Sequence, residues 1–237
     1  AFASIQDAVF VADAAITGNT ATLTAYADLT GNTSVLPAYA TLTANTTVLS
    51  AEVWVAQGDY TSHTSTLTSV VSMRPHVHLY GGFVGTETAR DERDWVTYGT
   101  TINGETERRC VIGADNATLD GFMVTGGYAA LDGGGLYNFC TSPTIAHCLF
   151  ASNSAGQHGG GVYNCAGARP LLENCVFLAN AAGNYGGGIA NFGAASPTIL
   201  NCTITGNAAE SNGDGMADWA VSSPTVTNSI LWNNGEE

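Results

Sequence analysis

Apolar and polar positions in the C-terminal half of the chain repeat with a constant step of 27 residues. Prolines mark this step at the start of each copy, and asparagines mark it near the end of each copy: Pro143, Pro170, Pro197 and Pro224, then Asn153, Asn180, Asn207 and Asn234. A fixed period of this length is typical of a stack of similar coils in which each coil contacts its neighbours. The repeat therefore predicts a solenoid.

Two apolar positions in each copy predict short strands with inward faces. The first column holds Ile145, Leu172, Ile199 and Val226, and the second holds Phe150, Phe177, Ile204 and Leu231. These residue types favour strands, and Gly, Pro and Asn flank them. A further strand is expected after each glycine block, such as 159–161. Because no helical window fits between the turns, the pattern predicts an all-β fold, a parallel β-helix.

Polar residues between the two apolar columns predict bends where one strand gives way to the next. This position holds His147, Asn174, Asn201 and Asn228. Asparagine can adopt the left-handed conformation and can bond to its copies above and below. The column that begins at Asn153 predicts a second ladder of this kind.

The N-terminal half contains one good helix candidate, residues 4–15, with Ser4 placed to cap its start. Its apolar residues fall on one face: Ile5, Ala8, Val9 and Ala12. A short amphipathic helix here suits a cap on the end of a solenoid. We therefore divide a single β-helix domain, 1–237, into four parts: a cap helix (1–16), a Thr/Ala-rich insert (17–50), irregular first coils (51–116) and regular repeats (117–237).

Several phrases outside the repeat carry a resemblance to a known family. They are Ile5-Gln-Asp-Ala-Val, Val53-Trp-Val-Ala-Gln-Gly-Asp-Tyr, and Leu79-Tyr-Gly-Gly-Phe-Val-Gly-Thr-Glu-Thr running into Arg93-Asp-Trp. With the Gly-Gly-Gly and Phe-x-x-Asn repeats, the chain resembles secreted bacterial right-handed parallel β-helix proteins of the polymorphic outer-membrane-protein type. The resemblance covers residues 1–16 and 51–237. It implies a right-handed coil, export and surface display, often as one piece of a longer protein, whereas the Thr/Ala-rich insert departs from the family's usual short loop.

The charge balance excludes two classes of partner. The chain has six arginines, no lysine and 20 acidic residues, which give a formal net charge of −14 at pH 7. Nucleic acids and anionic membranes both need a basic face. No apolar run approaches the roughly 20 residues of a membrane-spanning helix, so we expect no membrane insertion. Other protein surfaces, neutral glycans and cations remain as partners.

Cysteines occupy two kinds of position. One repeat column holds Cys148, Cys175, Cys202 and, in the last copy, Ser229, which predicts small buried core side chains. Cys140 and Cys165 lie in successive coils and form a disulfide if the geometry allows. Cys110 has no evident partner, and the lack of a Cys-x-x-Cys pair argues against structural zinc.

Two groups of side chains are candidates for metal binding. Glu210, Asp214 and Asp218 place three carboxylates near the last glycine block, where oxygen ligands can hold calcium. A solvated acidic turn is the alternative, and we favour it. His76 and His78 alternate on an expected strand, but two exposed strand histidines without a third ligand are the favoured interpretation. No other cofactor is expected.

The residues of the regular coils favour a protein without catalytic activity. Many β-helix enzymes cleave polysaccharides, but a β-eliminating lyase needs a cation, and Arg169 is the only one in the regular coils. A hydrolase needs an acid and a base at a defined separation. From residue 118 onward the aspartates form no such cluster, although Asp214 and Asp218 stay as candidates. The alternating charges of residues 90–94 predict a local ion-pair network that ties a loop down.

The leading functional hypothesis is an extracellular or surface-displayed structural protein that assembles into filaments or acts in adhesion. The chain stops directly after a repeat phrase, and we expect either an uncapped edge that templates another subunit or a fragment whose cap lies further along. The insert is expected to add strands to a neighbour through Thr22, Leu23, Thr41 and Leu42. A polysaccharide-active enzyme or glycan-binding module is the alternative, with Tyr137 and Tyr163 on an outward column to stack on sugar rings.

Overall fold

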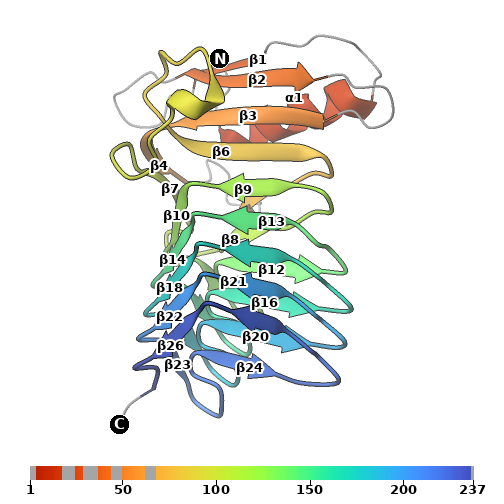
Figure 1. Cartoon of the computed structure of the whole chain (residues 1–237), viewed down its shortest axis with the longest axis vertical. Helices are drawn as coiled ribbons and strands as arrows, with labels where there is room; N and C mark the ends of the chain where they lie inside the picture. The colour runs from red at the N-terminus through yellow and green to blue at the C-terminus, as the bar shows by residue number, and fades with distance from the viewer. Residues whose placement is uncertain (1–3, 18–24, 29–36, 44–49, 62–67, 236–237) are drawn as a thin grey trace.

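Short strands stack coil upon coil along the long axis of the molecule, as the computed structural model shows (Figure 1). The structure describes residues 4–17, 25–28, 37–43, 50–61 and 68–235. Each regular coil gives one strand to each of four sheets, and successive coils pair in parallel. The predicted parallel β-helix is confirmed.

The four sheets run side by side down the stack. The first contains β1 (Ala25–Asp28), β2 (Pro37–Thr43), β3 (Ser50–Ala56), β6 (Val77–Phe83), β9 (Thr118–Asp120), β13 (Thr144–Ala146), β17 (Leu171–Glu173), β21 (Thr198–Leu200) and β25 (Thr225–Thr227). The second contains β4 (Gly58–Tyr60), β7 (Thr100–Asn103), β10 (Phe122–Thr125), β14 (Leu149–Ala151), β18 (Val176–Leu178), β22 (Thr203–Thr205) and β26 (Ile230–Trp232). The third contains β11 (Tyr128–Ala129), β15 (Ser154–Ala155), β19 (Ala181–Ala182) and β23 (Ala208–Ala209). The fourth contains β5 (Ser69–Ser72), β8 (Arg109–Ile112), β12 (Leu136–Phe139), β16 (Val162–Cys165), β20 (Ile189–Phe192) and β24 (Met216–Asp218).

The core is a set of columns of like residues, in the register that the 27-residue step predicts. Ile145 pairs with Leu172, and Leu172 pairs with Ile199, all three fully buried. Phe150 stacks on Phe177 with ring centroids 5.2 Å apart. Such columns remove apolar surface from water along the whole axis, at about 25 cal/mol per Å². The last members of these columns, Val226 and Leu231, are exposed, because no described coil covers them.

The predicted bends have the left-handed backbone conformation that the sequence indicates. The φ angles are positive at His147 (49°), Asn174 (53°), Asn201 (54°) and Asn228 (49°). The second asparagine column forms a buried ladder. The Asn153 Nδ2 donates to Asn180 Oδ1 at 3.0 Å, and the Asn180 Nδ2 donates to Asn207 Oδ1 at 2.9 Å. The left-handed bends and the Asn153 ladder are confirmed. In the bend column the structure gives a side-chain contact between His147 and Asn174, at 3.3 Å.

The predicted cap helix is α1 (Ile5–Thr17), which lies at the N-terminal end of the stack (Figure 1). The Ser4 Oγ accepts the Asp7 backbone N–H at 3.1 Å, as an N-cap does. All four residues of the expected apolar face are buried. Gln6, also buried, donates from Nε2 to the Ser72 carbonyl at 3.1 Å and accepts the Ser72 N–H, so its amide satisfies a strand edge under the helix.

The Thr/Ala-rich insert contributes strands to the chain's own sheet. β1 pairs antiparallel with β2, and β2 pairs antiparallel with β3, with Thr41 opposite Glu52 and Leu42 opposite Ala51. One side of Thr41 and Leu42 is thus paired with β3 of the same chain, whereas the pairing with β1 covers residues 37–40 of β2. That Thr41 and Leu42 add a strand to another subunit stays a prediction. Thr22 and Leu23 lie outside the described residues.

No helix in the part of the chain that the structure describes is long and apolar enough to cross a membrane.

Candidate functional site

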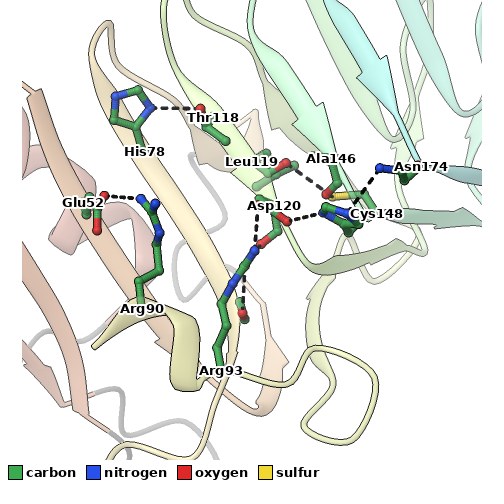
Figure 2. Close-up of polar contacts among 12 residues, drawn as sticks. Glu52, His78, Arg90, Arg93, Thr118, Leu119, Asp120, Ala146, Cys148 and Asn174 are labelled. Atoms are coloured by element: carbon green, nitrogen blue, oxygen red, sulfur yellow. Dashed lines mark hydrogen bonds and ion pairs between the residues drawn. The ribbon is translucent and has the colours of Figure 1, made fainter. Parts of the chain in front are cut away.

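A group of charged and titratable side chains surrounds Asp120, at the end of β9 (Figure 2). His147 follows β13 in the next coil, because Asp120 pairs with Ala146. Arg93 reaches the same carboxylate from the loop 84–99, just after a short 3₁₀ helix, η1 (Arg90–Glu92). Three segments far apart in sequence thus meet at one carboxylate.

Both oxygens of the Asp120 carboxylate have a partner in this group. Its Oδ2 accepts Arg93 Nη2 at 2.7 Å, and its Oδ1 lies 3.0 Å from His147 Nδ1. The Arg93 Nη1 also donates to the carbonyls of Asp120, at 3.1 Å, and Gly81, at 3.3 Å. The side chains of Arg93 and Asp120 are only 8 % and 12 % exposed, so removing either charge leaves the other desolvated.

The hydrogen bonds of His147 define its tautomer. Its Nε2 lies 3.3 Å from the Asn174 Nδ2. An amide nitrogen only donates, so Nε2 accepts, and the ring proton lies on Nδ1 and is donated to Asp120. Both ring nitrogens are therefore engaged, which leaves no free lone pair for general-base chemistry.

A hollow of about 340 Å³ lies beside His147 and is lined mainly by apolar side chains, including Trp95, Phe122 and Val176. The Trp95 ring lies 4.7 Å from the imidazole. Cys148 also touches the hollow, but its Sγ is buried and donates to the Ala146 carbonyl at 3.1 Å. Arg93 and Asp120 thus tie the loop 84–99 to β9, and the Cys148 thiol donates to the Ala146 carbonyl rather than to the imidazole.

The charge run 90–94 does hold this loop down, but its partners differ from those expected. Arg90 pairs with Glu52 on β3, and Arg93 pairs with Asp120, so the cations reach other coils (Figure 2). The Asp94 carboxylate instead accepts the backbone N–H groups of Val96 and Thr97, each at 3.0 Å. The prediction of a purely local network is wrong, because side chains of adjacent coils lie closer than sequence neighbours.

The two histidines considered as metal ligands do not share a strand. His76 lies in the turn before β6 with φ 63°, whereas His78 lies on β6 and bonds through Nδ1 to Thr118 Oγ1 at 2.9 Å. Burial lowers the pKa of His78 below its usual value, and the Glu52 carboxylate opposes this shift. The prediction that His76 and His78 alternate on one strand and share a face is therefore wrong, because His76 lies before the strand begins.

The carboxylates considered for calcium binding or catalysis are engaged separately. Asp214 Oδ1 accepts the Ala209 N–H at 2.7 Å, and Asp218 Oδ1 accepts Asn191 Nδ2 at 2.8 Å. Among the residues described, no three His, Cys, Asp or Glu side chains form a group that holds a metal ion. The structure does not bring Glu210 together with Asp214 and Asp218 as such a group, and calcium binding there stays a prediction.

The tyrosine column is less exposed than expected. Tyr137 pairs with Tyr163 and their rings stack at 5.7 Å, as predicted. Tyr163, however, is buried, and burial raises its pKa. The prediction that Tyr137 and Tyr163 form an outward column that stacks on sugar rings therefore needs correction. Tyr163 is buried, and Tyr137 is half-buried.

The predicted core cysteines are confirmed, and the expected disulfide is not formed. Cys148, Cys175 and Cys202 are buried and free, and Ser229 Oγ in the last coil accepts the Cys202 N–H at 3.0 Å. The structure pairs Cys165 with Phe139, one residue before Cys140. The Cys140 thiol donates to Ala166 O and the Cys165 thiol to Asn138 O, so the two side chains have different partners.

Thiol labelling is expected to modify Cys140 alone in the folded protein. It is the one exposed cysteine, whereas burial raises the pKa of Cys110 to about 12 and that of Cys165 to about 11, which leaves almost no thiolate at pH 8. Mass spectrometry after iodoacetamide treatment should show one adduct when folded and six in denaturant, matching the six cysteines. No adduct when folded and four when unfolded without reductant would instead indicate the Cys140–Cys165 disulfide.

Sequence reasoning missed the group around Asp120. The one signal was that the bend column has histidine at 147 where the later copies have asparagine. A second missed feature is a side-chain ladder in the fourth sheet. Hydrogen bonds of 2.8 Å join its successive members, Asn138, Asn164, Asn191 and Asp218. Both features are side-chain contacts between coils, which the residue types alone do not specify.

The geometry defines the class of protein: a repeat protein of the parallel β-helix type. Residues 100–237, more than half of the chain, match the family model described as a right-handed β-helix region, and the chain belongs to this family. The expected handedness is thereby confirmed. No curated protein matches the chain, and no solved structure matches it.

Proposed function

We propose that this β-helix is a non-catalytic structural rod displayed outside the cell, in the manner of the secreted bacterial proteins that its motifs resemble. One observation carries the proposal: polar side chains of successive coils bond to one another along the axis. The ladders from Asn153 to Asn234 and from Asn138 to Asp218 use these groups for stacking. Such an arrangement stabilises an elongated scaffold, because hydrogen-bonded side-chain networks strengthen the contact between coils.

Self-association is the use that we propose for the rod. Among the described strands, β1 is the outermost in the first sheet and pairs with β2 alone. An open strand edge can template pairing with another chain, and contacts of this kind continue into filaments or join the rod to another surface protein. The edge strand β1 is the element that we assign to assembly.

Electron microscopy with light scattering on the purified chain tests this assembly. We expect regular filaments from the unaltered protein and short rods from an Ala25→Lys/Ala27→Lys variant, since lysines on an edge strand oppose pairing. Thr198→Lys is the matched control, because Thr198 is exposed on β21, which has neighbours on both sides. It should assemble like the unaltered protein. Monodisperse rods without any substitution, or filaments that survive the β1 change, would refute the assembly proposal.

Surface display is tested separately on intact cells of the source organism. Antibody labelling without permeabilisation should detect the chain, and labelling that requires permeabilisation would refute display.

A further inference from the structure

The fourth sheet contains a column in which ring side chains give way to methyl groups. Register places Tyr137, Tyr163, Ala190 and Ala217 at the same position of β12, β16, β20 and β24. The two tyrosines stack, with centroids 5.7 Å apart and planes 21° from parallel. Over the next two coils the column continues in alanine, so its tyrosines end at Tyr163. The His158 ring, in the same coil, also stacks on Tyr163, with centroids 6.1 Å apart.

A hollow of about 230 Å³ lies where the next rings of that stack would be. Its lining consists of Ala190 and Ala217, the end of the stack at Tyr163, and His158, Tyr185, Asn191, Phe192 and Trp219. Tyr185 lies 5.3 Å from His158 and 5.0 Å from Trp219, centroid to centroid, which forms a wall of rings. Phe192 does not fill the space left by Ala190, and it is 41 % exposed.

The lining favours an uncharged apolar ligand. Asn191 is buried and engaged on both sides, since its Oδ1 accepts from Asn164 and its Nδ2 donates to Asp218. Aromatic rings make up most of the remaining wall, and Trp219 is 52 % exposed on it. The neighbouring Asp218 and the net charge of −14 disfavour anions. Aromatic pairs are stabilised beyond the area they bury, so a flat ring gains more here than an aliphatic group.

We propose that this hollow binds a small molecule that carries a single flat, uncharged aromatic ring. The ring takes the place of the missing tyrosine over Ala190, stacks on Tyr163 and is flanked by Tyr185 and Trp219. The volume suits a ligand of one ring, since pockets for drug-sized molecules are larger, about 300–1,000 Å³. The site does not depend on the structural role proposed above, because it lies on the side of the rod.

The backbone at position 190 is suited to a tyrosine, which gives a sharp test. Gly159 approaches the Cβ of Tyr163, and Gly186 approaches the Cβ of Ala190 in the same way, so the two positions are equivalent. Ala190→Tyr should therefore fill the hollow with the chain's own ring. Trp219→Ala is a second variant that removes a half-exposed wall residue and spares the core. Phe139→Ala is the control, because Phe139 is exposed on β12 and is not among the residues that line the hollow.

Calorimetric titration with p-cresol, the side-chain analogue of tyrosine, provides the measurement. We expect a dissociation constant of about 1 mM or tighter, which is reasonable for a ligand of this size. Ala190→Tyr and Trp219→Ala should each weaken binding at least tenfold, and Phe139→Ala should leave it unchanged. Circular dichroism shows whether each variant is folded.

Two comparison ligands complete the test. The anion 4-hydroxybenzoate should bind at least tenfold more weakly than p-cresol, and methyl β-glucoside should not compete. The proposal is overturned if p-cresol gives no binding at 20-fold above the expected constant, if a folded Ala190→Tyr variant binds it equally well, or if the glucoside binds more tightly.

Discussion

Gly187→Ala is expected to unfold the C-terminal coils, with a loss of at least about 3 kcal/mol in the free energy of unfolding. A Cβ at this position would lie 2.2 Å from the Ala208 carbonyl oxygen and 2.6 Å from its carbonyl carbon and nitrogen, all backbone atoms of the next coil. Backbone of an adjacent coil cannot rotate away as a side chain can. The coils would have to separate, which breaks the parallel ladder between them.

The matched control for this change is Gly99→Ala. A Cβ there has no neighbouring atom within 4 Å, and the backbone does not need a positive φ. We expect a change of no more than about 0.5 kcal/mol, in either direction. Urea unfolding followed by circular dichroism measures both variants, and hydrogen exchange shows whether the loss is confined to the coils near position 187. Equal unfolding midpoints for the two variants would contradict the close approach of the coils.

The 27-residue step was enough to predict the fold, because each column of the repeat has one physical role. Inward apolar residues such as Ile145 and Leu172 pair across coils as expected. Asparagines at bends such as 174 and 201 have positive φ for the reason predicted. In a solenoid each coil contacts its neighbours, so sequence period translates directly into spatial contact.

The site features could not be predicted in the same way, because they depend on departures from the repeat. Arg93 reaches Asp120 from an irregular loop, and no period relates the two residues. The aromatic hollow arises because alanine replaces tyrosine at positions 190 and 217 of the fourth sheet, while Phe192 and Trp219, two residues further along the chain in each coil, carry the rings. Column reasoning gives the position of each side chain, whereas the unfilled space depends on the joint packing of three coils.

The hairpin of β1 and β2 shows a further limit. The insert was predicted to be prone to β structure, and the strands are present, but their partner was assigned to another subunit. β2 pairs with β3 of the same chain instead, because the next strand along the chain has a high effective concentration. Propensity predicts that a strand forms, but not what it pairs with.

Asn180→Ala is expected to be the most damaging polar substitution in the core, with a loss of about 3–5 kcal/mol. Asn180 is 1 % exposed and sits in the middle of the asparagine ladder. Its Oδ1 accepts the backbone N–H and the Nδ2 of Asn153, at 3.1 and 3.0 Å, while its Nδ2 donates to the Phe150 carbonyl at 2.9 Å. Alanine leaves two donors and one acceptor buried without partners, which costs their full desolvation.

Asn201→Gly separates this loss from the general effect of removing an asparagine. Asn201 is exposed, and its φ of 54° suits glycine, so the free energy of unfolding should change by about 0.5 kcal/mol or less. Urea unfolding gives the two values, and hydrogen exchange at the Asn153 amide tests the mechanism, since that N–H loses its acceptor in Asn180→Ala alone. If the ladder only accompanies backbone stacking, the two variants will unfold together and the Asn153 amide will stay protected. If the ladder holds the coils in register, the Asn180 variant will lose protection at Asn153 before the chain unfolds globally, because the effect begins at one coil interface and spreads along the stack.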